Sequence, residues 1–381
     1  MKARFFLALL LIGSAPAAAA PGEDRPPIVV TGRSLSETER ALAECLRRHC
    51  PPDQDIDATL AHAENQFVAG GYKGARATTL ASLERNRGHA KDYPVAVSDL
   101  YRANGRIAAH LGEGKDYEWS TTAVGRTLRA GLPKDDPRLI GAQFESASMY
   151  AALGRPERAL DIYDEARSDA ERIGRPDLVA MARLRAAWLH HLAGDTDVAR
   201  RTLKDIAAER APELRLPRVT ALVLLARLDR KEGRLDSSDA LITELRALGA
   251  KRPVLIYSPP IDRSLPEARI TAGSITRLLP TQDYEDEWVD IGFWVTPEGR
   301  VDDVEILRSR GSPDWAKPVL RSIRGRLYAA PADGAGSYRV ERYTFTSLWK
   351  QDRVGTHLRM RSNDNRIEFL DLTAEPETAA R

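Results

Sequence analysis

Residues 150–159 read YAALGRPERA, and this pattern decides the fold because it recurs through the middle of the chain. In each copy a helical run ends at a glycine, and a second helical run starts a few residues later. Glycine ends a helix readily, since it adopts the left-handed conformation that a side chain opposes. Successive glycines are 42, 42, 40 and 39 residues apart, and they are Gly70, Gly112, Gly154, Gly194 and Gly233.

Small residues accompany these glycines at fixed distances. Seven positions before each glycine stand Ala63, Gly105, Ala147, Ala187 and Ala226. Five positions after it stand Ala75, Tyr117, Ala159, Ala199 and Ser238, and Tyr117 alone is large. Small residues at facing positions let two helices approach closely. Since one such hairpin cannot bury its own apolar face, we expect the units to stack into a solenoid.

This rhythm over residues 55–250 resembles the tetratricopeptide repeat. The interval here is about 40 residues, whereas that family repeats every 34 or so, and a HEAT-type solenoid is the alternative. The resemblance implies a concave surface that binds protein segments rather than a reaction. Glu64, Arg106 and Arg227 follow the small residue of the first helix and are candidate binding residues. The alternative is that these charges only face solvent.

The chain changes character after Gly249. Residues 251–287 are broken by prolines and predict a linker, and residues 288–307 read WVDIGFWVTPEGRVDDVEIL. Apolar residues alternate in this stretch, which is typical of a strand, and the Pro-Glu-Gly turn leads into a second strand. A short helix over 318–326 and a long strand over 338–350 follow. The expected fold is mainly α, then α+β in β-β-α-β order, with residues 351–381 as an extension.

The strand–PEG–strand signal and the later YAAP at residues 328–331 resemble the C-terminal domain of TonB, the energy transducer of bacterial outer-membrane import. The resemblance covers residues 288–350. Arg310 stands where that family has a second serine, and Lys317 replaces the acidic residue that opens its helix. We therefore expect the fold without the transducer's role. The resemblance implies an exposed edge at Tyr338–Lys350, with Thr344 and Phe345 as candidate binding residues.

The N-terminus predicts export. Residues 1–20 have a charged start, a short apolar run and an alanine-rich tail, which indicates a cleaved signal peptide and a periplasmic protein. A retained anchor is the alternative, although a spanning helix needs about 20 strongly apolar residues. Residues 21–54 are expected to hold an extended segment and a first helix. Within them Ile28, Val29 and Val30 resemble a TonB box, which pairs as an added strand, and an ordinary linker is the alternative.

Cys45 and Cys50 are the two cysteines of the chain. On a continuous helix they would lie about 7.5 Å apart along the axis, too far to bridge. Because the prolines at 51 and 52 end any helix there, the chain can turn and close a disulfide, which an oxidising compartment favours. Free thiols are an alternative. A metal site with His49 is another, but ligands this crowded do not match a zinc spacing.

Charge and motifs exclude several functions. Lys and Arg number 57 against 55 Asp and Glu, with both signs interleaved, so no nucleic-acid surface is expected. The sequence has no phosphate-binding loop, no nucleophile elbow and no HExxH, so no catalytic, cofactor or metal site is predicted. We expect a non-enzymatic, exported adaptor or scaffold for protein or peptide partners, without stable membrane insertion after signal cleavage. A component of TonB-linked import and an enzyme with an unrecognised site are the alternatives.

Overall fold

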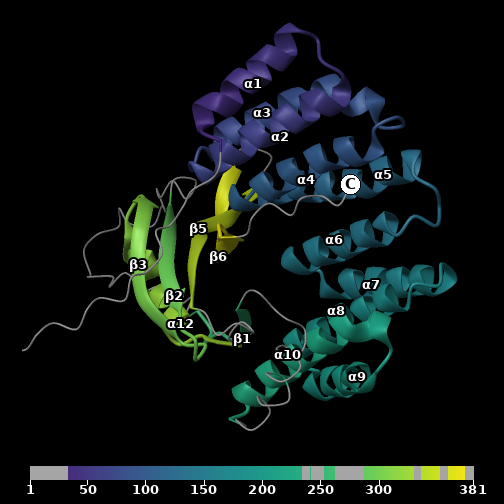
Figure 1. Ribbon diagram of the computed structural model, residues 1–381, viewed down its shortest axis with the longest axis vertical. Helices are drawn as coiled ribbons and strands as arrows, with labels where there is room; N and C mark the ends of the chain where they lie inside the picture. The colour runs from purple at the N-terminus through teal and green to yellow at the C-terminus, as the bar shows by residue number, and fades with distance from the viewer. Residues whose placement is uncertain are drawn as a thin grey trace, which may run out of the picture.

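The computed structural model describes residues 33–233, 241, 253–261, 287–329, 336–351 and 359–373. A curved stack of helices is followed by antiparallel strands that lie beside the stack, with β5 near α4 and β1 near α10 (Figure 1). The expected signal peptide, the TonB-box-like residues 28–30 and most of the linker lie outside the described residues. Within them no helix has both the length and the apolar character that crossing a membrane requires.

The helices follow one another in antiparallel pairs after α1 (Leu35–Arg47). The pairs are α2 (Pro52–Val68) with α3 (Tyr72–Asn86), α4 (Pro94–His110) with α5 (Gly114–Gly131), α6 (Arg138–Ala152) with α7 (Pro156–Arg172), and α8 (Pro176–Leu192) with α9 (Thr196–Ala208), followed by α10 (Arg215–Lys231). Each glycine predicted to turn the chain has a positive φ, between 72° and 104°. Gly174, between α7 and α8, has a φ of 66° as well, so a further turn joins two units.

The small residues lie where the helices of a unit meet. Ala63 packs in one core cluster with Ala75, and Ala187 packs in another with Ala199. In the α4–α5 unit the smaller residue of the facing pair is on the first helix and the larger one is on the second. A Cβ at Gly105 would lie 3.7 Å from the ring of Tyr117, so glycine on one helix makes room for tyrosine on the other. The exception to the alanine pattern therefore obeys the same packing rule.

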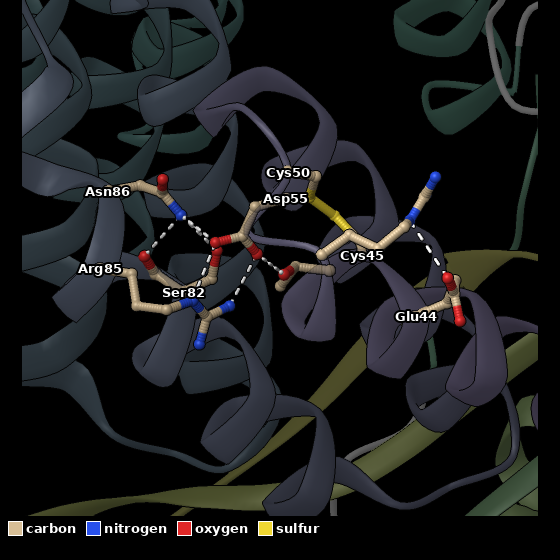
Figure 2. The surroundings of a disulfide bond; sticks show 9 residues. Glu44, Cys45, Cys50, Asp55, Ser82, Arg85 and Asn86 are labelled. Atoms are coloured by element: carbon tan, nitrogen blue, oxygen red, sulfur yellow. Dashed lines mark hydrogen bonds and ion pairs between the residues drawn. A yellow bond between two sulfur atoms is a disulfide. The ribbon is translucent and has the colours of Figure 1, made fainter.

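The two cysteines pair beside the start of α2. Helix α1 ends at Arg47 and the chain turns through His49, whose φ is 51°. This turn brings the Cα atoms of Cys45 and Cys50 to 5.2 Å, and the predicted disulfide is present (Figure 2). Helix α1 ends at Arg47, before the prolines at 51 and 52, and α2 begins at Pro52. The disulfide ring therefore closes between the two helices and does not interrupt α2.

The same corner holds a buried carboxylate. Asp55 accepts hydrogen bonds from Arg85 Nε at 2.8 Å, Asn86 Nδ2 at 2.7 Å and Thr59 Oγ1 at 3.0 Å (Figure 2). Burial opposes ionisation of Asp55, but these hydrogen bonds outweigh it and hold its pKa below the usual value. They fasten α3 to the first turn of α2.

The C-terminal strands form two antiparallel sheets. The larger has the order β3-β2-β5-β6, and the smaller pairs β1 with β4. The expected β-β-α-β order is present as β2, β3, α12 and β5, while β1, β4 and β6 are additional. The bounds are β1 (Val254–Tyr257), β2 (Trp288–Val295), β3 (Val301–Arg310), α12 (Lys317–Arg324), β4 (Leu327–Ala329), β5 (Ser337–Gln351) and β6 (Arg359–Asp371).

Strand β2 of the larger sheet is buried on both faces. Val289 and Phe293, like the other alternating apolar residues of β2, are fully buried in a core that includes Val319 and Ile323 of α12. The opposite face carries Trp288, which packs against helices α2 to α4. This is the burial that a strand alternation predicts when each face meets a different partner.

The predicted exposed edge at Tyr338–Lys350 is wrong. Strand β5 is an inner strand, because β2 pairs with it from Ser337 to Thr344 and β6 pairs with it from Glu341 to Gln351. Thr344 and Phe345 are buried. Residues 351–381 were expected to be only an extension, yet they supply the strand that covers this edge.

Candidate functional site

The sheet is fixed to the helices by a buried joint, here called the upper joint, between β2, β5 and helices α2 to α4. Trp288 of β2 packs with Phe67 and Tyr72 in one core cluster. The α2–α3 turn passes so close that a Cβ on Gly70 would lie 2.5 Å from Trp288 Nε1. The indole therefore requires glycine at this turn for space as well as for its φ of 83°.

A buried arginine supplies the polar part of the upper joint. Arg342 is fully buried, and its Nε and Nη2 donate to the two oxygens of Asp290 at 2.6 and 2.8 Å. Its Nη1 donates to the carbonyl of Phe67 at 2.8 Å, and its guanidinium lies 3.9 Å from the centre of the Trp288 ring. A charge so enclosed is tolerated because it is paired and hydrogen-bonded, and one of those bonds crosses to α2.

A second chain of polar groups crosses the same joint. Thr344 Oγ1 lies 2.8 Å from the hydroxyl of Tyr72 and 3.0 Å from Nδ1 of His110. Burial, together with the charges of Arg106 and Arg342, lowers the pKa of His110 to about 3. His110 is therefore neutral near pH 7. Thr344 thus binds the chain's own helices rather than a partner.

The lower end of the sheet region contacts the last repeat. Arg227 Nη2 donates to the carbonyl of Leu255 in β1 at 2.9 Å, and burial lowers the pKa of Arg227. Val223 and Ile256 share a core cluster beside it. Arg227 was predicted to bind partners, but its side chain is engaged inside the chain. Together with the upper joint, this contact fixes the strands to both ends of the described helical stack.

A groove of about 1150 Å³ lies between the helices and the end of β6. The first helices of successive units, α2, α4, α6 and α8, form one wall together with Tyr117, Thr121 and Val124 of α5, and Glu368–Leu372 form the other. Two of the predicted binding residues, Glu64 on α2 and Arg106 on α4, both line it. Their positions one residue after Ala63 and Gly105 place them on the inner surface, as the repeat register predicts.

Most of the charges in the groove are compensated. Arg102 Nε donates to Glu145 at 2.9 Å, and Glu368 pairs with Arg366 at 2.7 Å. Asp371 pairs with Arg339. Tyr117 of α5 and Glu368 of β6 both line the groove. Burial and the charge of Glu368 raise the pKa of Tyr117.

Three exposed charges in the groove are different. Neither Glu64 nor Arg106 forms an ion pair with any residue that the structure describes. Arg185 of α8 lies 5.2 Å from the centre of the Phe144 ring and has no carboxylate partner within the same ranges. These side chains keep their charge available for a bound molecule. Arg185 was not among the predicted binding residues, although it lies two positions before Ala187.

The groove presents aromatic, charged and backbone groups together. It combines aromatic rings, Phe144 and Phe369, with free guanidinium groups and a strand. Among the described residues no cluster of three or more His, Cys, Asp and Glu is arranged to hold a metal ion.

Comparison with known proteins bears on the helices. Residues 139–208 match the family model of the tetratricopeptide repeat. This match spans α6 to α9. It does not reach residues 288–350, so the resemblance of the sheet to TonB stays a prediction. A search of curated proteins finds no match.

Several solved structures are similar to this chain at low identity. BtubC (BKLC) from P. vanneervenii has a TM-score of 0.45 and 15% identity, over 61% of this chain and 96% of that chain. A putative kinesin light chain from Podosopora anserina with nearly identical TPR-like repeats has a TM-score of 0.38 and 15% identity, over 52% and 96%. The apo quorum sensor NprR from B. thuringiensis has a TM-score of 0.37 and 16% identity, over 56% and 60%.

Proposed function

We propose that this protein is an exported, periplasmic adaptor that binds a segment of a partner protein in the groove. The observation that carries the proposal is the groove itself, an open space of about 1150 Å³ lined by five helices and the end of β6. It exposes Arg106, Arg185 and Glu64 without an ion-pair partner in the described chain. Stacked repeats commonly use such an extended concave surface for binding.

Crosslinking from inside the groove tests this function. A photoreactive amino acid replaces Ser148, which lines the groove on α6. In the matched control it replaces Trp119, an exposed residue of α5 that does not line the groove. We expect one protein, joined through one short segment, from position 148 only, and the purified segment should bind the purified chain. The same proteins crosslinked from both positions would refute groove binding.

Export is a separate part of the proposal and rests on residues 1–20. The mature chain should begin between residues 18 and 21 and be released by osmotic shock, because the apolar run is too short to span a bilayer. Sequencing of the mature N-terminus measures this directly. An intact Met1 recovered with the membrane fraction would contradict it.

A part in TonB-linked import is the second candidate function. Strand β3 favours it, because β2 is the one strand that pairs with β3 in the described part of the chain. The box-like residues 28–30 would need such an edge. Isolation of inner-membrane transducer components with the tagged protein would support import, and their absence alongside a captured groove partner would favour the adaptor.

A further inference from the structure

The end of β6 faces the groove with its edge rather than with one face. Five consecutive residues, Glu368 to Leu372, line the groove. Side chains of a strand point alternately to opposite faces, so a face would present only every second residue. The sheet order agrees, because β6 is the last strand and, among the described residues, only β5 pairs with it. The groove therefore lies along an open edge of the sheet.

The register shows which backbone groups point into that edge. Leu372 N–H donates to the carbonyl of Val340 at 2.8 Å, so the backbone of Leu372 faces β5. Successive residues of an antiparallel strand alternate the direction of their backbone groups. The N–H and C=O groups of Phe369 and Asp371 therefore face away from β5. Among the backbone bonds outside helices and strands in the described ranges, none involves either residue.

On the opposite wall of the groove, the charged side chains that lack an ion-pair partner in the described ranges are mostly basic. Arg106 and Arg185 are exposed there without a carboxylate partner in the described ranges, against Glu64 as the single uncompensated acid. The remaining carboxylates of the wall and of β6 already pair with arginines of this chain. A strand placed along β6 would lie between its open backbone groups and these two guanidinium groups.

We propose that the groove binds an acidic, extended segment of a partner protein as a strand added to β6. This inference rests on the proposed adaptor function and specifies its ligand. The main chain of the segment bonds the N–H and C=O groups of Phe369 and Asp371, and its carboxylates pair with Arg106 and Arg185. Five residues at about 3.3 Å each give a segment roughly 16 Å long. Main-chain bonds supply the affinity and alternate side chains supply the selectivity.

The charge part is tested by selection from a random dodecapeptide library displayed on phage. We expect selected peptides rich in Asp and Glu, with affinity lowered at least tenfold by Arg106→Glu with Arg185→Glu. Arg183→Glu is the matched control, because Arg183 is on the same helix as Arg185 and does not line the groove. It should change affinity less than threefold. Selected peptides without acidic residues, or no peptide selected at all, would overturn the proposal.

The strand part is tested on the tightest selected peptide by N-methylation of one backbone nitrogen at a time. Methylation removes a donor, so an added strand loses affinity at every second position only. We expect losses of tenfold or more that alternate with positions of little effect. Equal losses along the peptide, or none, would refute strand addition. The adaptor function would still stand if the photoreactive residue at position 148 crosslinks one segment in cells. Strand addition and the adaptor function can therefore be refuted separately.

The source of the segment is tested by deletion of residues 374–381, which follow β6 and include Glu375 and Glu377. If the segment belongs to a partner, deletion leaves the affinity for the selected peptide within threefold. A rise of tenfold or more would mean that this chain fills its own groove, and the proposal of a partner would be wrong.

Discussion

Substitution of one glycine by alanine separates backbone strain from loss of the sheet–helix contact. Gly70 and Gly154 occupy the same turn in two units, with φ values of 83° and 76°. A Cβ at Gly70 would lie 2.5 Å from Trp288 Nε1, whereas a Cβ at Gly154 has nothing within 4 Å. Gly70→Ala should therefore cost what Gly154→Ala costs plus the displacement of a buried indole.

The magnitudes follow from the two terms. A residue with a side chain in the left-handed region costs about 1–2 kcal/mol, and both variants carry this cost. Overpacking a filled core adds about 1–3 kcal/mol, and only Gly70→Ala carries it, because the indole is held by Arg342 on one face and cannot move freely. The free energy of unfolding should thus fall by about 2–5 kcal/mol for Gly70→Ala and about 1–2 for Gly154→Ala.

Urea unfolding followed by tryptophan fluorescence and by circular dichroism measures both variants. For Gly70→Ala the fluorescence transition, which includes Trp288, should move to lower urea than the helical transition. For Gly154→Ala the two signals should move together. Equal losses in the two variants, with coincident transitions in both, would show that Gly70 does not contact the sheet as described.

Three further changes probe the same contacts. Arg342→Met leaves Asp290 with Arg308, at 2.6 Å, as its remaining ion-pair partner and removes the donor to the Phe67 carbonyl. Urea unfolding should therefore show a loss of about 1–3 kcal/mol, and an unchanged free energy of unfolding would contradict this. Ala187→Leu should lower the helical melting temperature, since overpacking costs about 1–3 kcal/mol, while the sheet signal stays; an unchanged melting temperature would disprove the repeat register. Because the folded pKa of His110 is about 3 against 6.5, the unfolded chain binds more protons between these values, so stability should fall as pH drops below 6.5. His110→Gln should flatten that slope in a pH series of urea titrations, and an identical slope would contradict the buried neutral histidine.

The repeats could be predicted because local signals determine them. Spacing alone predicts the turn at Gly154 and the close helix contact at Ala147. The turn requires glycine, and the close contact requires a small residue. Gly174 was missed, although Gly-Arg-Pro at 174–176 repeats the Gly-Arg-Pro at 154–156 and marks the same kind of turn. A search for repeats of about 20 residues would have found the turns between units as well as those within them.

The wall of the groove could not be predicted, because tertiary contacts override local preference there. Strand β6 reads RMRSNDNRIEFLD, and Asn, Asp and Arg give it little strand character. Pairing with β5, the strand that precedes it in the chain, makes it a strand. Asp290 of β2 and Arg342 of β5 are buried on the face of the sheet that meets the helices. In the sequence, these two opposite charges within strand segments were the one indication that this second face is buried.

Amide hydrogen exchange in the presence of the crosslinked segment tests the central claim most directly. NMR would compare the purified chain with and without the segment that Ser148 captures. If the groove is the binding site and β6 its receiving edge, exchange should slow at Phe369 and Asp371, whose amides face the groove. The exposed surface of α5 around Trp119 should be unaffected. Protection around Trp119 with unchanged exchange at Phe369 and Asp371 would contradict the account.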